Sequence, residues 1–128
     1  MNKQEIVKTF CTVLKDFLSD IYNSYPDNSL LVLQQATNAM ILTDPRSVAE
    51  NFMTCIGPYS DKILSKDESF FLDGGLESEL ATDEYSFLLE EIKKISKIWK
   101  NPETSAKTKN SIWKYFQILI KLGKNLKD

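Results

Sequence analysis

Histidine is absent from this chain of 128 residues, and arginine occurs once, as Arg46. Histidine is the commonest general base, the commonest metal ligand and the usual partner of a nucleophilic serine or cysteine. Glycine-rich phosphate loops of the forms G-x-x-x-x-G-K-[ST] and G-x-G-x-x-G are missing as well. Because the familiar catalytic constellations are missing, we expect a protein without enzyme activity, cofactor or metal.

Cysteine and long apolar runs are also scarce. Cys11 and Cys55 lie 44 positions apart with no histidine near them, which predicts small buried thiols and argues against a disulfide framework or a zinc site. No apolar run exceeds four residues, whereas a bilayer-spanning helix needs about 20. The N-terminal residues lead into an amphipathic pattern and not into the apolar centre of a signal peptide, so we expect an intracellular protein.

Proline and glycine occur four times each, and all eight fall between blocks that have helical periodicity. This placement predicts an all-α fold, and the length fits one domain over residues 1–128. We expect a compact single-domain bundle of about five helices, with an acidic glycine-containing loop between the third and fourth main helices. The expected helices are 3–25, 30–42, 45–56, 83–100 and 102–122. Short helical turns are expected within 58–72, with their apolar residues Ile63, Leu64, Phe70, Phe71 and Leu72 pointing inward.

Particular residues and blocks carry further expectations. The block 30–42 is apolar nearly all round, which is typical of a helix in the middle of a bundle. Asp44 is the expected N-cap of the third helix, with Pro45 at its first position. For the last helix, Asn101 is the expected N-cap, and Gly123 is the glycine expected where the helix ends.

Carboxylates are concentrated in residues 67–91, where nine acidic residues occur without one basic residue. Paired carboxylates can act as acid and base or bind Mg²⁺ or Ca²⁺. The residue order of an EF-hand loop is absent, however, and acidic residues also suit a solvated loop followed by the start of a helix. We favour the solvated loop over the metal site. The candidate acidic patch consists of Asp73, Glu77, Glu79, Asp83 and Glu84.

Basic residues are concentrated in residues 91–128, which hold ten of the 16 basic residues and three of the 18 acidic ones. On a helix, Lys107, Lys114 and Lys121 recur every seven residues and therefore lie along one side. We favour the solvated face of an outer helix. The row could also bind phosphates of nucleic acid or of a membrane surface, or an acidic segment within the chain or in a neighbouring copy. A net charge of −2 and a single arginine disfavour nucleic acid.

Aromatic residues accompany these lysines. Aromatics at helical spacing are usually core residues, but Trp113 lies toward one edge of the apolar face and Tyr115 toward the other. One of them could therefore reach the surface, where it would anchor a partner. The candidate interaction surface comprises Lys107, Lys114, Lys121, Lys124, Trp113 and Tyr115.

Three strings of the chain resemble a known family. They are Asp16-Phe17-Leu18-x-Asp20-Ile21 with Tyr25-Pro26, then Pro58-Tyr59-x-Asp61-Lys62-Ile63-Leu64-Ser65-Lys66-Asp67-Glu68-x-Phe70-Phe71-Leu72, and Thr108-Lys109-x-x-Ile112-Trp113-Lys114-Tyr115-x-Gln117. In this order the pattern is similar to small uncharacterised helical proteins of nucleocytoplasmic large DNA viruses (giant viruses). The acidic loop around Gly74-Gly75 departs from that pattern. The resemblance implies a viral protein made in the host cytoplasm, abundant late in infection or packaged in particles, and it transfers no catalytic residues.

Taken together, the sequence favours a non-enzymatic protein-interaction or structural module, as a component of a viral particle or virus factory or as an adaptor. The alternative is a nucleic-acid-binding helical protein that uses its C-terminal lysine face. We expect a protein partner, including self-association through the acidic and basic patches, and no insertion into a membrane. The expected location is the host cell cytoplasm, at the virus factory, or the virion.

Overall fold

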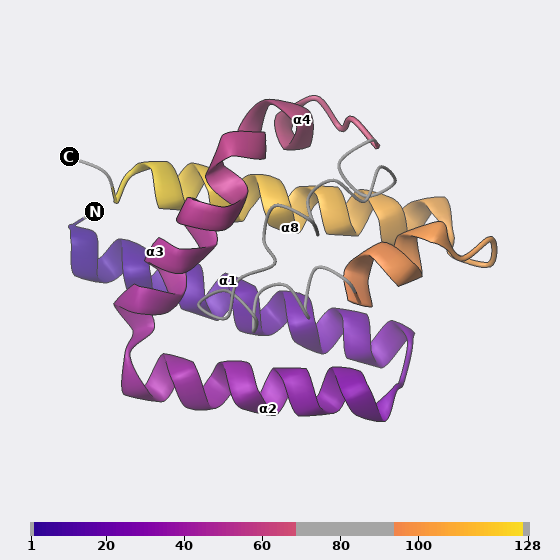
Figure 1. Cartoon of the computed structure of the whole chain (residues 1–128), viewed down its shortest axis with the longest axis horizontal. Helices are drawn as coiled ribbons and strands as arrows, with labels where there is room; N and C mark the ends of the chain where they lie inside the picture. The colour runs from indigo at the N-terminus through magenta and orange to yellow at the C-terminus, as the bar shows by residue number, and fades with distance from the viewer. Residues whose placement is uncertain (1, 69–93, 127–128) are drawn as a thin grey trace.

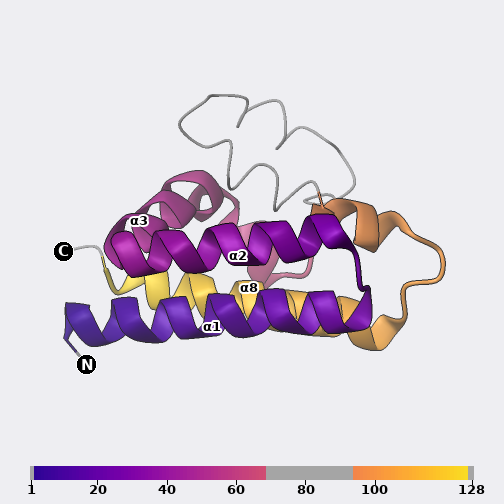
Figure 2. The same cartoon turned by 90° about the horizontal axis from the view of Figure 1, so that it is seen from below.

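The computed structural model describes residues 2–68 and 94–126, and every regular element within them is helical. Three long helices lie roughly along one axis: α1 (Lys3–Ser24), α2 (Asn28–Thr43) and α8 (Ala106–Lys124) (Figure 1). α2 and α8 both run back antiparallel to α1, so that the start of α1 and the end of α8 lie at the same end of the molecule (Figure 2). The predicted all-α bundle is confirmed.

α1 follows the prediction closely. Asn2 caps its N-terminus, because the side-chain oxygen accepts a hydrogen bond from the backbone N–H of Glu5 at 2.8 Å. Its apolar stripe is buried and packs against α8, α2 and α3. The buried residues of α1 are Ile6, Val7, Phe10, Cys11, Leu14, Phe17, Leu18 and Ile21.

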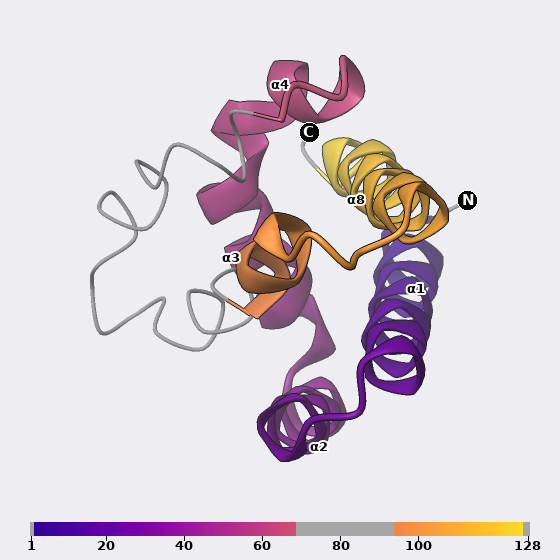
Figure 3. The ribbon, with the colours of Figure 1, turned by 90° about the vertical axis from the view of Figure 1, so that its right-hand side faces the viewer.

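The predicted central position of α2 is wrong. Val32 is 62% exposed and Leu42 is 83% exposed, whereas Leu30, Thr37 and Ile41 are buried. Seen from the end of the bundle, α2 lies at its periphery (Figure 3). Thr37 faces inward, and its hydroxyl donates to the carbonyl of Leu33 at 2.8 Å, so that its polar group is satisfied inside the core. A nearly uniform apolar helix therefore leaves apolar side chains at the surface.

α3 (Pro45–Ile56) begins as predicted, with Asp44 accepting from the backbone N–H of Ser47 at 3.2 Å and Pro45 in the first turn. It is followed by a 3₁₀ turn (Gly57–Tyr59) and by α4 (Ser60–Leu64). Ile63 points inward as expected, but Leu64 is 39% exposed, which corrects its predicted burial. Phe70, Phe71 and Leu72, which are also expected to point inward, lie outside the described residues.

The last helix starts and ends differently from the prediction. Residues 94–100 are helical, and residues 83–93 of the same predicted helix lie outside the described part. α8 begins at Ala106, and its N-cap is Ser105, whose hydroxyl accepts from the backbone N–H of Thr108 at 3.1 Å. Asn101 instead accepts from the N–H of Glu103 in the preceding turn. Gly123 lies inside the helix, and the C-cap is Asn125.

The core lies between α1, α3, α8 and residues 94–100. Phenylalanine side chains link three of these helices. Phe10 of α1 packs edge-on against Phe52 of α3 at 5.3 Å between ring centroids, and Phe17 of α1 packs edge-on against Phe116 of α8 at 5.5 Å. Such pairs add to the stabilisation from apolar burial. This packing fixes the positions of α1, α3 and α8 relative to one another.

Candidate functional site

The outer face of α8 carries the predicted lysine row. All four lysines of the candidate surface, Lys107, Lys114, Lys121 and Lys124, are exposed. The row belongs to a longer stripe whose members are spaced alternately four and three residues apart, as expected for one side of a helix. The exposed stripe consists of Lys107, Ser111, Lys114, Ile118, Lys121 and Asn125. At its centre Ile118 is 45% exposed, so an apolar side chain lies between two lysines.

Trp113 does not belong to this surface, which corrects its assignment as a candidate partner anchor. It is 3% exposed, and its ring packs edge-on against Trp99 at 5.0 Å between centroids and 71° between planes. The preceding helix supplies Trp99, which is itself 2% exposed. Burying two indoles against one another fixes residues 94–100 on α8. Trp113 is therefore part of the core and is not accessible to a partner.

Tyr115 is half-buried and binds α1. Its ring stacks on Phe17 at 4.9 Å between centroids, and its hydroxyl donates a hydrogen bond to a carboxylate oxygen of Asp20. Burial, this hydrogen bond, and the negative charges of Asp20 and Asp16 raise the pKa of Tyr115 to about 12, because each disfavours the phenolate. The hydroxyl is thus engaged within the molecule and is not a free anchor for a partner.

Other residues of the C-terminal string also contact neighbouring elements. The side-chain amide of Gln117 donates to the carbonyl of Ile63 at 3.2 Å, at the end of α4. The ammonium group of Lys109 lies 5.3 Å from the centroid of the Trp99 ring, which is a cation–π arrangement. The C-terminal string of the resemblance, residues 108–117, therefore joins α8 to α1, to α4 and to residues 94–100. It serves packing, and the lysines beside it remain at the surface.

The candidate acidic patch of Asp73, Glu77, Glu79, Asp83 and Glu84 lies entirely outside the described residues. Within residues 2–68 and 94–126, no three cysteine, aspartate or glutamate side chains come together as a metal site would require. The hypothesis of a metal site in the acidic segment therefore stays a prediction.

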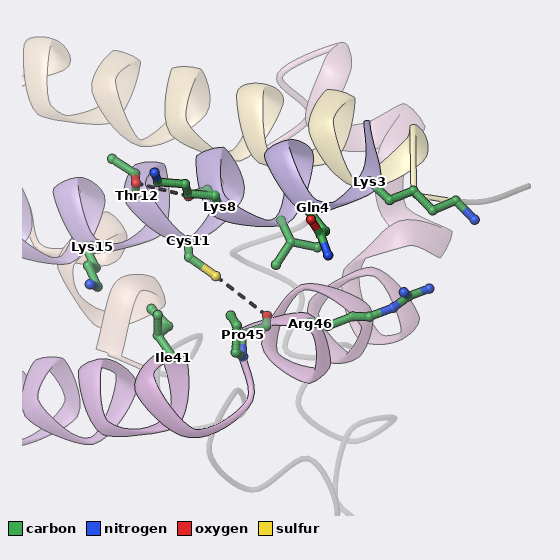
Figure 4. Close-up of a pocket in the computed structure, with 10 residues that line it drawn as sticks. Lys3, Gln4, Lys8, Cys11, Thr12, Lys15, Ile41, Pro45 and Arg46 are labelled. Carbon is green, nitrogen blue, oxygen red and sulfur yellow. Dashed lines mark hydrogen bonds between the residues drawn. The ribbon is translucent and has the colours of Figure 1, made fainter. Parts of the chain in front are cut away.

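A cavity of about 560 Å³ lies between α1 and the junction of α2 with α3 (Figure 4). Two adjacent rows of α1 form one wall. Ile41, Pro45 and Arg46 form the other wall. The α1 rows are Lys3, Val7, Cys11 and Lys15, and beside them Gln4, Lys8 and Thr12. Its lining therefore joins an apolar floor to four cationic side chains, and among the described residues that line it none carries a carboxylate.

The cavity was not predicted from the sequence, although its signal is present there. Residues 3, 7, 11 and 15 recur every four positions, which brings them into one row along a helix. Lysines occupy both ends of this row, and Val7 and Cys11 lie between them. Residues 1–90 hold 15 acidic and six basic residues, so their overall negative charge does not indicate this local cationic group. The opposite wall comes from residues about 30 positions later, which a pattern within one helix cannot reveal.

Cys11 lies at the floor of the cavity as a neutral thiol. It is 4% exposed, as predicted for a buried thiol, and its sulfur donates a weak hydrogen bond to the carbonyl of Pro45 at 3.6 Å (Figure 4). Burial raises the pKa of Cys11, because the thiolate would lose solvation, and the nearby charge of Lys15 only partly opposes this effect. A thiol held neutral is a poor nucleophile. Cys11 therefore contributes apolar surface to the cavity.

Comparison with known proteins gives no relationship: no protein-family model, curated protein or solved structure matches this chain. Across the ranges that the structure describes, no helix combines the length and apolar character needed to cross a membrane. Within the described residues, the α8 stripe and the cationic cavity are the candidate functional surfaces.

Proposed function

We propose that the protein is a non-enzymatic interaction module that binds an acidic protein partner through the exposed stripe of α8. The observation that carries this proposal is the position of Ile118. An isoleucine that is 45% exposed lies between Lys114 and Lys121, one helical turn from each. A partner that meets this stripe gains from covering an apolar side chain and from pairing carboxylates with the flanking lysines.

The stripe fits a protein better than a nucleic-acid backbone. A phosphate backbone gains nothing from an isoleucine at the centre of its contact, whereas protein interfaces combine an apolar centre with a polar rim. Nucleic-acid interfaces also favour arginine for bidentate contacts to phosphate and guanine. The single arginine of this chain lies in α3 and pairs with Glu50 at 2.7 Å. Lysines at the rim would chiefly steer the encounter and set its orientation.

The support for α8 suits this role. Its inner face is anchored by Trp113, Phe116 and Gln117, so the stripe is presented on a helix whose position is already determined. Binding then requires little ordering of the backbone, which reduces the entropic cost of association. From the resemblance to giant-virus proteins we further propose that the partner belongs to a viral particle or to a virus factory in the host cytoplasm.

A photo-cross-linking experiment tests the proposal. A photoreactive amino acid introduced at Ser111 lies in the stripe without removing a lysine or Ile118. Irradiation in the cells that naturally make the protein is expected to yield a specific cross-link to an acidic protein. With that partner purified, the Lys114→Glu/Lys121→Glu variant should bind at least tenfold more weakly, and Ile118→Ser should weaken binding several-fold.

The matched control is Lys97→Glu/Lys100→Glu, which changes the charge equally at two exposed lysines outside α8. It should leave the affinity within about twofold of the original. A parallel titration measures DNA and RNA binding at low salt, with and without glutamine at Lys107, Lys114, Lys121 and Lys124. Nucleic-acid binding would replace our proposal if the chain bound DNA or RNA, if these four changes abolished that binding, and if the photoreactive residue at position 111 gave no protein cross-link. Turnover in a broad hydrolase and nucleotide screen would overturn the non-enzymatic assignment.

A further inference from the structure

We propose that the cavity between α1 and the α2–α3 junction is a binding site for a single-chain amphipathic anion, in which an apolar chain ends in a carboxylate or phosphate. This inference does not depend on the α8 stripe. The cavity volume of about 560 Å³ lies within the range of roughly 300–1,000 Å³ that is usual for small-molecule sites.

The floor of the cavity suits an apolar chain. Val7, Cys11 and Ile41 are buried residues that line it, and the Pro45 ring contributes further apolar surface. The Cys11 sulfur points toward Pro45 and donates a hydrogen bond to its carbonyl (Figure 4). The thiol is therefore already satisfied and needs no polar group of a ligand. An alkyl chain laid along this floor would displace water from apolar surface, which is favourable in proportion to the area covered.

The charged groups suit an anionic head. Lys15 lies toward one end of the α1 row, and Lys3 and Arg46 lie toward the other (Figure 4). Lys8 comes from the adjacent row. Arg46 is already paired with Glu50, so its charge is partly compensated. Lys8 and Lys15 add two further positive charges to the lining, and no described residue that lines the cavity is acidic.

The combination excludes other ligand classes on chemical grounds. A metal cation would be repelled, because the lining supplies ammonium and guanidinium groups where carboxylates would be needed. Free phosphate or a nucleotide phosphate would satisfy the lysines but would leave the apolar floor uncovered. A neutral hydrocarbon would cover the floor but gain nothing from the lysines. An amphipathic anion satisfies both parts.

Isothermal titration with four matched probes tests this assignment: decanoate, decyl phosphate, decanol and decyltrimethylammonium. Inorganic phosphate serves as the head group without a chain. We expect decanoate or decyl phosphate, or both, to bind at least tenfold more tightly than decanol, and the cationic probe and inorganic phosphate to show no saturable binding. The two anionic probes distinguish a carboxylate ligand from a phosphate ligand.

Two variants link binding to the cavity. Lys8→Gln/Lys15→Gln removes two positive charges from the lining with a residue that favours helix, and it should weaken binding of the anionic probe at least tenfold. The control, Lys97→Gln/Lys100→Gln, removes the same charge from exposed lysines outside the cavity and should leave the affinity within about twofold. Thermal unfolding of both variants checks that each is folded.

Methyl NMR locates the ligand independently of any substitution. The anionic probe should shift the methyl resonances of Val7 and Ile41, which line the cavity, and leave that of Ile118 on the outer face of α8 unchanged. The proposal would be overturned if neither decanoate nor decyl phosphate bound more tightly than decanol, if binding survived in Lys8→Gln/Lys15→Gln, or if the shifts were confined to residues outside the cavity. None of these results bears on the protein partner of α8, so the two proposals fail separately.

Discussion

At the scale of the residue, Gly123 has a packing role that its place near the end of the chain conceals. It is buried inside α8, where that helix faces Met53 of α3. A Cβ atom added at Gly123 would overlap the Sδ and Cγ atoms of Met53 and would lie 3.1 Å from its Cε atom. The glycine therefore allows α8 and α3 to approach each other, and its conformational freedom at a helix end is not used.

This contact gives a prediction in which two effects oppose each other. Alanine in place of glycine within a helix gains about 1 kcal/mol of helix propensity, whereas overpacking a core costs about 1–3 kcal/mol. We expect Gly123→Ala to lower the free energy of unfolding by about 1 kcal/mol, measured by urea denaturation, since the overlap involves atoms close to the Met53 backbone as well as its flexible end.

A double-mutant cycle supplies the control. In a Met53→Ala background the overlapping Sδ and Cγ atoms are gone, so Gly123→Ala should there be stabilising by up to about 1 kcal/mol. A reversal of sign between the two backgrounds would establish the contact. If Gly123→Ala stabilised the protein with Met53 present, the close approach of the two helices would be disproved.

At the scale of the element, the start of α8 depends on one hydroxyl. The Ser105 side chain accepts from the backbone N–H of Thr108 at 3.1 Å and thereby satisfies one of the unpaired donors of the first turn. Removing a side chain of this kind costs about 1 kcal/mol, and replacing it with glycine costs only a few tenths. We expect Ser105→Ala to lower the free energy of unfolding by about 1 kcal/mol and Ser105→Gly by much less.

The comparison variant is Asn101→Ala. Its side chain accepts from the N–H of Glu103 in a turn at 2.9 Å, outside the helix, so amide exchange in the first turn of α8 should be unaffected. Ser105→Ala should instead accelerate exchange of the Thr108 amide, which hydrogen-exchange NMR measures directly. If the Thr108 amide exchanged faster in Asn101→Ala and not in Ser105→Ala, Asn101 and not Ser105 would be the N-cap.

Asn101 and Ser105 show how closely a sequence pattern can locate the start of a helix. The pattern N-P predicts a break, and a break does occur there, but a turn of several residues follows before Ser105 starts the helix. Both residue types cap helices well, so their propensities could not choose between them. The choice depends on Thr104, whose hydroxyl donates to the carbonyl of Ile98 and folds the turn back on the preceding helix. That contact joins residues six positions apart in a turn, which the periodicity of neither helix indicates.

The faces of the helices were predictable to different degrees. α1 and α8 have separate apolar and polar sides, and their buried residues follow directly from spacing. α2 has apolar residues nearly all round, so spacing could not indicate which of them face outward, and Val32 and Leu42 do. The lysine row of α8 was predictable for the same reason as its core face. The cationic cavity was not, because its second wall comes from a different pair of helices.

At the scale of the whole molecule, the positions of the charged side chains in space do not follow the acidic-then-basic order of the sequence. Basic residues of the first helix, Lys3, Lys8 and Lys15, line the cavity, while four lysines of the last helix, Lys107, Lys114, Lys121 and Lys124, are exposed on α8. α1 and α8 pack side by side, so the two cationic groups belong to one pair of helices (Figure 2). The contrast between an acidic first part and a basic last part is therefore a poor guide to where each charge acts.

The hydrogen bond between Tyr115 and Asp20 connects these two helices, which are the first and last of the described chain. Its loss should cost about 1 kcal/mol, less than the roughly 1.5–3 kcal/mol typical of a bond to a charged group, because both groups lie near solvent. We expect Tyr115→Phe to retain the stacking on Phe17 and to lower the free energy of unfolding by that amount at pH 8. Urea denaturation measures it, and Tyr22→Phe, at a tyrosine packed at the edge of the core, is the matched control.

The pH dependence of this difference identifies its cause. The pKa of Tyr115 is raised to about 12 in the folded state from an ordinary value of 10.0, so the neutral phenol is the form that folding favours. Its contribution is therefore fully present below pH 10 and is lost as the pH rises through 12, where the folded protein too would carry a phenolate beside Asp20. Other groups titrate in this range, but they do so equally in both proteins. The difference in unfolding free energy between the original chain and Tyr115→Phe should consequently shrink between pH 10 and pH 12. A difference that stayed constant over that range would mean that the hydroxyl acts through packing and not through its bond to Asp20.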